Sequence, residues 1–186
     1  VKSAVRGGFF SVDLEQTRRA FEQLPWVRTV SVRRKFPWRL EVNLEEHVAL
    51  ARWNNKELVN SYGEVFAAQS SEALPSFVGQ PDTSAQVTEM YAALGKELGG
   101  VKLNIAQISL SPRFAWQVKL DSGMVLELGR EQVQQRLARF VAVYPYTLAT
   151  RTRAVNHVDL RYRNGFAAYL PEGAGSQAGQ GSGKRV

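Results

Sequence analysis

The chain has 186 residues, of which 44% are hydrophobic and 22% charged, so it resembles ordinary soluble domains and is long enough for one or two of them. It contains no cysteine, which excludes disulfides and cysteine-bound metal sites, and no apolar run is long enough to span a bilayer. The net charge of +7 favours acidic partners, an anionic membrane surface or nucleic acid, without choosing among them.

After an apparent helix at the start of the chain, the next predicted elements are a second helix and a strand. Asp13 and Gln16 have the spacing of a helix capping box, and apolar residues then recur at helical intervals. The helix is predicted to end at Pro25. Val30 and Val32 alternate with polar residues, which indicates a half-buried strand.

A second strand, with a very regular period of two, is predicted over residues 40–45 after a turn at Phe36-Pro37. The pattern changes after Trp53, so residues 1–53 are predicted to form a compact βαβ-like unit. The chain begins at Val1 inside an apparent helix, which indicates a piece of a longer protein.

Short strands and a loop are predicted after Trp53. Strands are expected over residues 58–60 and 64–67, with a turn at Tyr62-Gly63 between them. Proline and glycine residues predict a loop over residues 74–81.

A helix and a run of three strands follow. The helix is predicted to begin at Thr83, with Gln86 as its capping partner, and to end at Gly99-Gly100. Its apolar face comprises Val87, Met90, Tyr91, Leu94 and Leu98. The three strands are expected over 105–110, 115–120 and 124–128, with a turn at residues 121–123.

The last predicted elements are a helix and a hairpin. Apolar residues at helical spacing predict a helix from Val133, which Pro145 ends. Residues 158–162 alternate as a strand, Asn164-Gly165 suits a two-residue turn, and residues 166–170 return as the last strand.

These elements predict an α+β fold with two units and a tail. A βαβ unit over residues 1–53 is followed by a larger antiparallel β domain with flanking helices over residues 54–171. Residues 172–186 are rich in glycine, serine and glutamine and are predicted to be disordered.

Few residues offer catalytic or metal-binding chemistry. His47 and His157 are far apart and lack the spacing of a metal motif. A triad of His157 with Ser111 or Ser122 stays open, although neither serine lies in a nucleophile-elbow motif. We therefore expect no enzyme, no metal site and no cofactor.

A cluster over residues 33–39 interleaves basic and aromatic side chains: Arg33, Arg34, Lys35, Phe36, Trp38 and Arg39. Such a cluster suits nucleic acid, or anionic lipid near a membrane. It also suits a solvated hairpin tip whose aromatic side chains pack on neighbouring helix residues. Because no DNA-binding or RNA-binding motif accompanies it, we do not expect nucleic acid as a partner.

Short motifs in both units follow one another in an order and spacing that are specific together. In the first unit they are Leu24-Pro25-Trp26-Val27, Val30-Ser31-Val32-Arg33, Leu40-Glu41-Val42 and Ala51-Arg52-Trp53. In the second they include Leu128-Gly129-Arg130, Arg136-Leu137-Ala138-Arg139-Phe140-Val141 and Val158-Asp159-Leu160-Arg161-Tyr162. The first set resembles a POTRA domain and the second a β domain, both in the versions found in the FtsQ family of bacterial cell-division proteins.

The resemblance implies a scaffold without enzymatic activity that assembles and regulates septal cell-wall synthesis. It implies an inner-membrane protein with one transmembrane helix upstream of Val1, with the present residues in the periplasm and concentrated at the division septum. It also places the first POTRA strand upstream of Val1. The implied partners are FtsB and FtsL, with other divisome proteins bound through the POTRA domain.

The resemblance places the FtsB site on the last strand of the β domain and on residues near it. The matching residues are Arg113, Arg161, Tyr162, Gly165 and Phe166, with Tyr169 or Leu170 in place of the aromatic residue near the strand's end.

The same segment is predicted to form an open sheet edge, which invites the addition of a partner strand. A two-residue turn would place Phe166, Ala168 and Leu170 on one face of the sheet. Arg161 and Arg163 would share that face, which suits an acidic, amphipathic partner. A loop one residue longer would instead turn Phe166 and Leu170 inward.

Two other classes of protein are alternatives to the scaffold. One is a POTRA-containing chaperone or translocation partner of outer-membrane assembly, although POTRA units there come in tandem or precede a barrel. The other is an enzyme acting on the cell wall, which needs a catalytic constellation that the sequence does not show.

Overall fold

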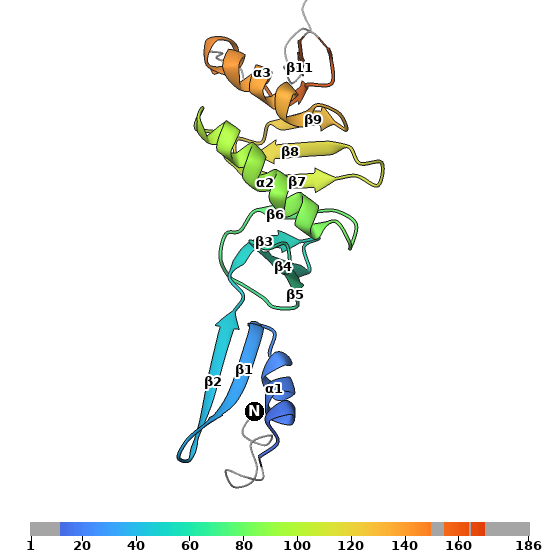
Figure 1. Cartoon of the computed structure of the whole chain (residues 1–186). Helices are drawn as coiled ribbons and strands as arrows, with labels where there is room; N and C mark the ends of the chain where they lie inside the picture. Colours follow the sequence, from blue (N-terminus) through green and yellow to red (C-terminus); the bar gives the residue numbers. More distant parts are fainter. Residues whose placement is uncertain (1–11, 150–154, 164, 170–186) are drawn as a thin grey trace, which may run out of the picture.

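A small unit at one end of an elongated molecule contains the first described elements (Figure 1). The computed structural model describes residues 12–149, 155–163 and 165–169. Residues 12–46, here called the hairpin unit, contain α1 (Leu14–Glu22) and two antiparallel strands, β1 (Val27–Lys35) and β2 (Arg39–Glu46). The predicted helix start is confirmed, because the Asp13 carboxylate accepts hydrogen bonds from the backbone N–H groups of Glu15 and Gln16.

A nine-stranded sheet forms the rest of the described chain. Its strands are β3 (Ala49–Trp53), β4 (Glu57–Asn60), β5 (Val65–Phe66), β6 (Ser76–Val78), β7 (Ile105–Leu110), β8 (Trp116–Leu120), β9 (Val125–Gly129), β10 (His157–Asp159) and β11 (Ala167–Tyr169). They lie in the order β11-β10-β9-β8-β7-β6-β3-β4-β5. The α+β class predicted from the sequence is confirmed.

The sheet is mixed, so the prediction of an antiparallel β domain was wrong in this respect. β6 pairs parallel with both β3 and β7, and β10 pairs parallel with β9. Parallel neighbours need a long crossover connection. Two helices, α2 (Ser84–Gly99) and α3 (Val133–Thr147), provide the crossovers from β6 to β7 and from β9 to β10.

β6 lies within residues 74–81, which the sequence predicted to be a loop. Its three residues are too few to show a period of two, and Pro75 and Gly79 flank it. The strand forms because β3 and β7 pair with its two sides, and its Phe77 side chain is fully buried. The local sequence contains none of this information.

β3 pairs with β4 and β6 and therefore belongs to the large sheet. The strand pairing thus changes between Glu46 and Ala49, whereas the sequence predicted the first unit to continue to Trp53. The division into domains stays a prediction, as does the first POTRA strand expected upstream of Val1.

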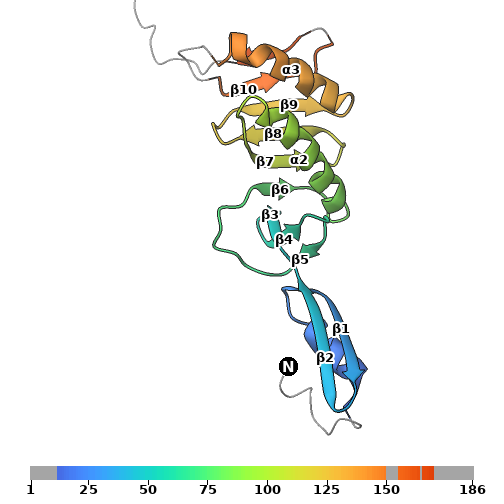
Figure 2. The same cartoon turned by 60° about the vertical axis from the view of Figure 1, so that its left-hand side comes forward.

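α2 and α3 cover one face of the large sheet (Figures 1 and 2). The predicted apolar faces of the two helices are confirmed, since Leu94, Leu98, Leu137 and Phe140 are fully buried. Along the strands under them, buried apolar residues alternate with less buried polar ones. The sheet therefore has one face packed against helices and one face open to solvent.

Two details of the helices differ from the sequence predictions. Thr83 does not cap α2 through its side chain; its hydroxyl donates to the carbonyl of Gln80 at 2.8 Å instead. Pro145 lies inside α3, which continues to Thr147. Proline lacks a backbone N–H and crowds the carbonyl four residues before it, and α3 ends two residues after Pro145.

An apolar contact joins the hairpin unit to the large sheet. Phe66 of β5 is almost fully buried and lies edge-on to Trp26, with 5.3 Å between ring centroids. His47 stacks on the Phe66 ring, with 4.3 Å between ring centroids. The His47 side chain is only 11% exposed and packs in this junction.

A polar contact accompanies Phe66 at the same junction. Arg28 of β1 donates to Glu45 of β2 at 2.8 Å and to Glu64, just before β5, at 2.7 Å. Its guanidinium also lies 4.0 Å from the ring centroid of Tyr62. The hydrogen bonds from Arg28 first, and from Asn60 second, hold the pKa of Glu64 below its ordinary value.

Candidate functional site

The end strand β11 forms one edge of the large sheet. In the described residues it pairs with β10 alone, antiparallel, with Val158 opposite Ala168. An edge strand exposes a row of unpaired backbone donors and acceptors. The open edge expected at this segment is therefore present.

The neighbouring hydrogen bonds show which backbone groups of β11 point outward. Next to β10, the Asn156 carbonyl accepts a hydrogen bond from the Val125 N–H, and the Leu160 N–H donates to the Glu127 carbonyl. The backbone N–H and C=O groups of even-numbered residues in this segment therefore point toward β9. Because the directions of the backbone groups alternate along a strand, the N–H and C=O groups of His157 and Asp159 point toward β11. Ala168, which lies opposite Val158, then directs its N–H and C=O away from the sheet.

The register differs from the predicted one and turns Phe166 inward. A two-residue turn would have placed Arg163 opposite Phe166, but the observed pairs are Asp159 with Ala167 and Val158 with Ala168. Phe166 is half-buried and packs edge-on against Phe140 of α3, at 5.8 Å between ring centroids. This is the inward packing expected for a longer loop, so the predicted outward face of Phe166 was wrong.

Other predicted residues of the site remain on the surface beside the edge. Tyr162 is 53% exposed, and Gly165 and Ala168 are also exposed. Tyr169 is 52% exposed and lies edge-on to His157 on the face opposite Phe166. Leu170 lies outside the described residues.

Arg161 is held in place by an aspartate that the sequence analysis did not select. The buried Asp159 carboxylate accepts two bonds from the guanidinium of Arg161, at 2.7 and 2.9 Å, and a third from its backbone N–H at 3.0 Å. These bonds lower the pKa of Asp159 and raise that of Arg161. The signal in the sequence was the spacing of two, which puts both side chains on one face of a strand.

Gly129 allows the close approach of Arg161 to β9. It has a φ of +75°, and a Cβ atom there would lie 2.8 Å from Nη1 of Arg136 and 3.1 Å from Cγ of Arg161. The positive φ favours glycine here, and any side chain would displace one of the two arginines. The two arginines therefore share the space above the end of β9.

Two open hollows flank the segment before β11. One, of about 470 Å³, is lined by Tyr162, Arg163, Gly165, Phe166 and Ala167. The other, of about 390 Å³, lies between this segment and α3, whose Arg136, Arg139 and Val143 contribute to its lining.

Two arginines of α3 bond to backbone carbonyls of neighbouring segments. Arg136 donates to the Leu128 carbonyl at 2.7 Å, and Arg139 donates to the Arg163 carbonyl. These bonds anchor α3 to β9 and to the segment before β11. The hollow next to α3 therefore has a positively charged wall in which Arg136 and Arg139 are fixed by bonds to backbone carbonyls.

Arg113 lies apart from the other predicted site residues. It is exposed in the turn between β7 and β8, beside Phe114, which has a φ of +58° and is 55% exposed. Trp116, just after this turn, pairs with Gly129 at the end of β9. Because β10 runs parallel to β9, Arg161 follows β10 at this same end of the sheet. The structure thus places Arg113 at the same end of the sheet, with β9 and β10 between its turn and the edge strand β11.

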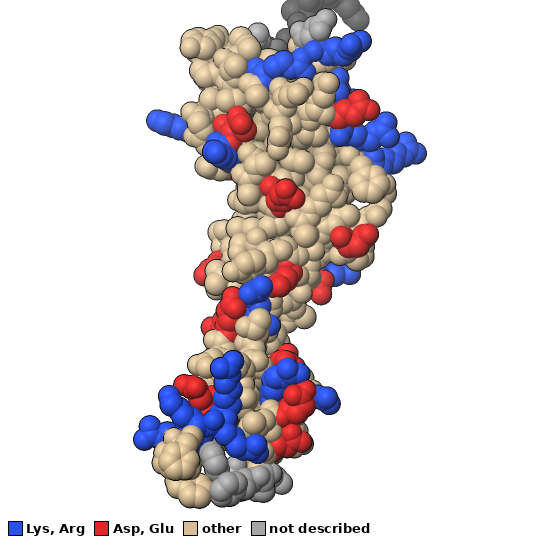
Figure 3. All heavy atoms as spheres, viewed as in Figure 1, with Lys and Arg blue, Asp and Glu red and all other residues tan. Residues whose placement is uncertain are grey.

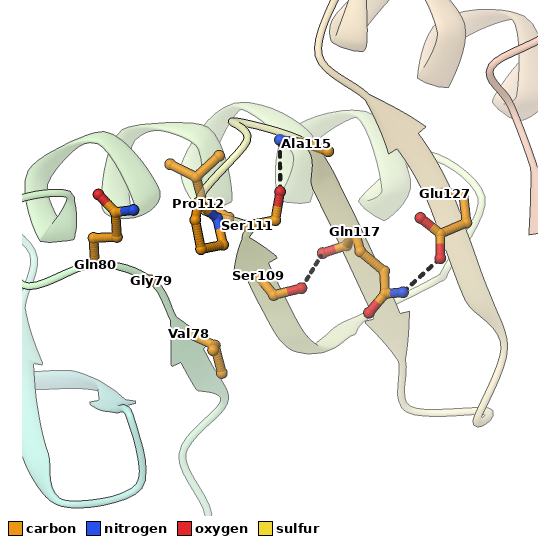
Figure 4. A pocket seen from close by; sticks show the side chains of 10 residues that line it. Val78, Gly79, Gln80, Ser109, Ser111, Pro112, Ala115, Gln117 and Glu127 are labelled. Atoms are coloured by element: carbon orange, nitrogen blue, oxygen red, sulfur yellow. Dashed lines mark hydrogen bonds between the residues drawn. The ribbon is translucent and has the colours of Figure 1, made fainter.

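The open face of the sheet also has a hollow of about 420 Å³, lined in part by Ser109, Ser111, Gln117 and Glu127 (Figure 4). Its polar side chains bond one another or the backbone: Gln117 donates to Glu127 at 2.5 Å, and the Ser111 hydroxyl accepts from the N–H of Ala115 at 3.0 Å. Ser111 therefore stabilises the β7–β8 turn.

The described residues contain no group of three or more histidine or acidic side chains that could bind a metal. Over the same residues, no helix has the length and apolar character needed to cross a bilayer.

Two family models match the chain. Residues 1–47 match "POTRA domain, FtsQ-type", and residues 51–161 match "Cell division protein FtsQ/DivIB, C-terminal". The two matches meet where the strand pairing changes from the hairpin unit to the large sheet. This pair of matches argues against a chaperone of outer-membrane assembly.

Relatives described as "Cell division protein FtsQ" are similar over most of the chain. The relative from Nitrosospira multiformis is 44% identical over 168 residues, which is 90% of this chain and 71% of the relative. The relative from Burkholderia pseudomallei is 42% identical, over 90% of this chain and 70% of its own length. The relative from Bordetella pertussis is 37% identical, over 88% and 68%.

Proposed function

The chain belongs to the FtsQ family of bacterial cell-division proteins, and we propose that it is a divisome scaffold that binds FtsB and FtsL. The family is a non-enzymatic component of the division machinery. The chain lies in the periplasm, held to the inner membrane by a transmembrane helix upstream, and acts at the division septum in septal wall synthesis. Other divisome proteins bind through the POTRA domain.

The observation that carries the proposal is the open edge at β11. Ala168 directs its N–H and C=O away from β10, so a partner strand can extend the sheet by main-chain hydrogen bonds. Such bonds supply affinity without depending on the partner's side chains. Specificity must then come from the residues beside the edge.

Those residues favour an acidic, amphipathic partner strand. Tyr162 offers an exposed aromatic surface at the hollow beside β11, and Arg163 contributes a positive charge to the same hollow. Arg161 is oriented by Asp159 and needs little further ordering to contact an acidic side chain. Phe166 contributes indirectly, since its packing on Phe140 fixes the segment that leads into β11.

A pair of proline substitutions at adjacent alanines tests strand addition. In Ala168→Pro the lost N–H points outward, so the protein should melt like wild type but bind the periplasmic segment of FtsB at least about tenfold more weakly. In Ala167→Pro the lost N–H points toward Asp159, so β11 itself should be disrupted and the protein should melt earlier. Thermal melts and a binding titration on both variants measure the two effects.

The two alanines serve as controls for each other, because the chemical change is identical and only the direction of the lost group differs. Wild-type affinity of Ala168→Pro for FtsB would rule out strand addition at this edge. Early melting of both variants to the same extent would indicate that β11 is paired on both sides.

A further inference from the structure

The apex of the β1–β2 hairpin exposes two large apolar side chains. Phe36 is 91% exposed and Trp38 is 65% exposed, with Pro37 between them. Single exposed apolar residues are common on soluble proteins, but here three such residues in a row form the outermost point of a hairpin. Nearly all of the Phe36 side chain is exposed, so its ring is available for another contact.

Basic side chains surround this apex. The strand register pairs Lys35 with Arg39 next to the turn, and Arg33 with Glu41 two rungs farther on. Glu41 is the one acidic residue in this segment, and it lies 3.5 Å from Lys35. Lys and Arg side chains gather over this end of the molecule in Figure 3.

We propose that this apex, Phe36 to Trp38 with Arg33, Lys35 and Arg39, docks on the surface of a bilayer that contains anionic phospholipid. Aromatic rings favour the headgroup region of a membrane, where one part of the ring is wet and the other apolar. Lysine and arginine have stems long enough to reach headgroup phosphates while the rings insert. Neither contact is strong alone, and stable surface binding needs two such signals together.

The position of the apex in the molecule agrees with this partner. Arg34 donates to the Val12 carbonyl at 2.8 Å, so the start of the described chain lies beside the apical half of the hairpin. β11 lies at the opposite end of the elongated molecule (Figures 1 and 2). If the chain is anchored upstream of Val1, a step that rests on the proposed function, the apex faces the membrane and β11 points away from it.

Binding of the purified 186-residue chain to vesicles tests the proposal. One set of vesicles contains phosphatidylcholine with about one third phosphatidylglycerol, and the other contains phosphatidylcholine alone. We expect cosedimentation with the anionic vesicles only, weakening as salt is raised. Phe36→Ser combined with Trp38→Ser should lower the partition coefficient at least about tenfold. Arg33→Ser combined with Arg39→Ser should lower it about fivefold per charge.

Matched variants elsewhere separate the apex from the rest of the surface. Tyr146→Ser removes an aromatic side chain that is 83% exposed on α3, and Lys56→Ser with Lys119→Ser removes two exposed charges from the large sheet. These variants should bind the vesicles like wild type. The apex variants should melt and bind FtsB like wild type, which keeps this test separate from that of the β11 edge.

Three results would overturn the proposal. One is the absence of wild-type binding to anionic vesicles, and another is equal loss of binding in the apex and matched variants. The third is apex-dependent binding of a soluble acidic polypeptide, such as polyglutamate, without any binding of vesicles, because it would assign the apex to an acidic protein partner.

Discussion

The hairpin unit and the large sheet bury very different amounts of apolar surface. Among the described residues up to Val48, only Val12 and Thr17 are buried. In the large sheet, one continuous apolar core extends from Ala51 of β3 to Leu160 beyond β10. The sheet can therefore be stable on its own packing, whereas the described part of the hairpin unit has little core of its own.

The contact between the two units matters for the hairpin unit, because the described part of that unit has little core of its own. Phe66 is the most buried aromatic side chain at the boundary, and both of its aromatic neighbours, Trp26 and His47, come from the hairpin side. The hairpin unit thus uses a side chain of the large sheet as part of its own apolar packing. Its orientation is coupled to the sheet through this contact and through Arg28.

The largest effect should distinguish a leucine in the core from one in the hairpin. Leu126→Ala, at a fully buried position of β9, should lower the free energy of unfolding by about 2 to 5 kcal/mol. Leu44→Ala removes the same atoms from a side chain that is 44% exposed on β2, and it should cost about 0.5 kcal/mol or less. Urea unfolding of both variants measures the difference. Equal costs would contradict the unequal distribution of the core.

A smaller and more local effect is expected at the junction. Phe66→Ala should cost about 2 to 3 kcal/mol, since part of the packing it removes lies against Trp26 and His47. Hydrogen exchange of the variant should be compared with that of wild type. The exchange rate should increase more for the β1 amides than for the β7 amides. Phe77→Ala is the control, because its ring packs on Tyr91 of α2, away from the hairpin unit. If β1 and β7 lose protection equally in Phe66→Ala, the hairpin unit does not depend on this contact.

The same contrast explains which elements of the fold were predictable. The strands from 105 to 128 and the helix cap at Asp13 follow from short-range patterns, and the structure has them within a residue or so. β6 and the parallel pairings depend on neighbours far away in the sequence, which no local period records. For the same reason β3 was assigned to the hairpin unit, although it pairs within the large sheet.

The segment of the candidate site was predicted from the sequence, but the pairing register of its last strand was not predicted correctly. The segment from 161 to 169 was selected by its family resemblance and by its place at the end of the sheet. Asn164-Gly165 favours a two-residue turn, yet the pairing is shifted and Phe166 is half-buried against Phe140. Packing between distant residues of this kind is not recorded in the sequence of the turn.

The smallest expected effect concerns the polar half of the junction, and it depends on pH. Hydrogen bonds from Arg28 hold the pKa of Glu64 below its ordinary value of 4.5. A carboxyl whose pKa is lowered by folding stabilises the folded state at pH values above its unfolded pKa. This contribution is lost as the pH falls through the lowered pKa of the folded state. It is small here, because the Glu64 side chain is 45% exposed and water screens the ion pair.

Glu64→Gln should therefore lower the protection of β1 amides slightly at neutral pH, because the amide cannot form the ion pair with Arg28. The gap between wild type and Glu64→Gln should close as the pH falls below about 4, where the protonated carboxyl resembles the amide. Hydrogen exchange, corrected for the intrinsic effect of pH, measures the gap. Glu57→Gln, at an exposed position of β4, is the control and should show no gap at any pH. A gap of unchanged size in acid would mean that the charge of Glu64 does not support the junction.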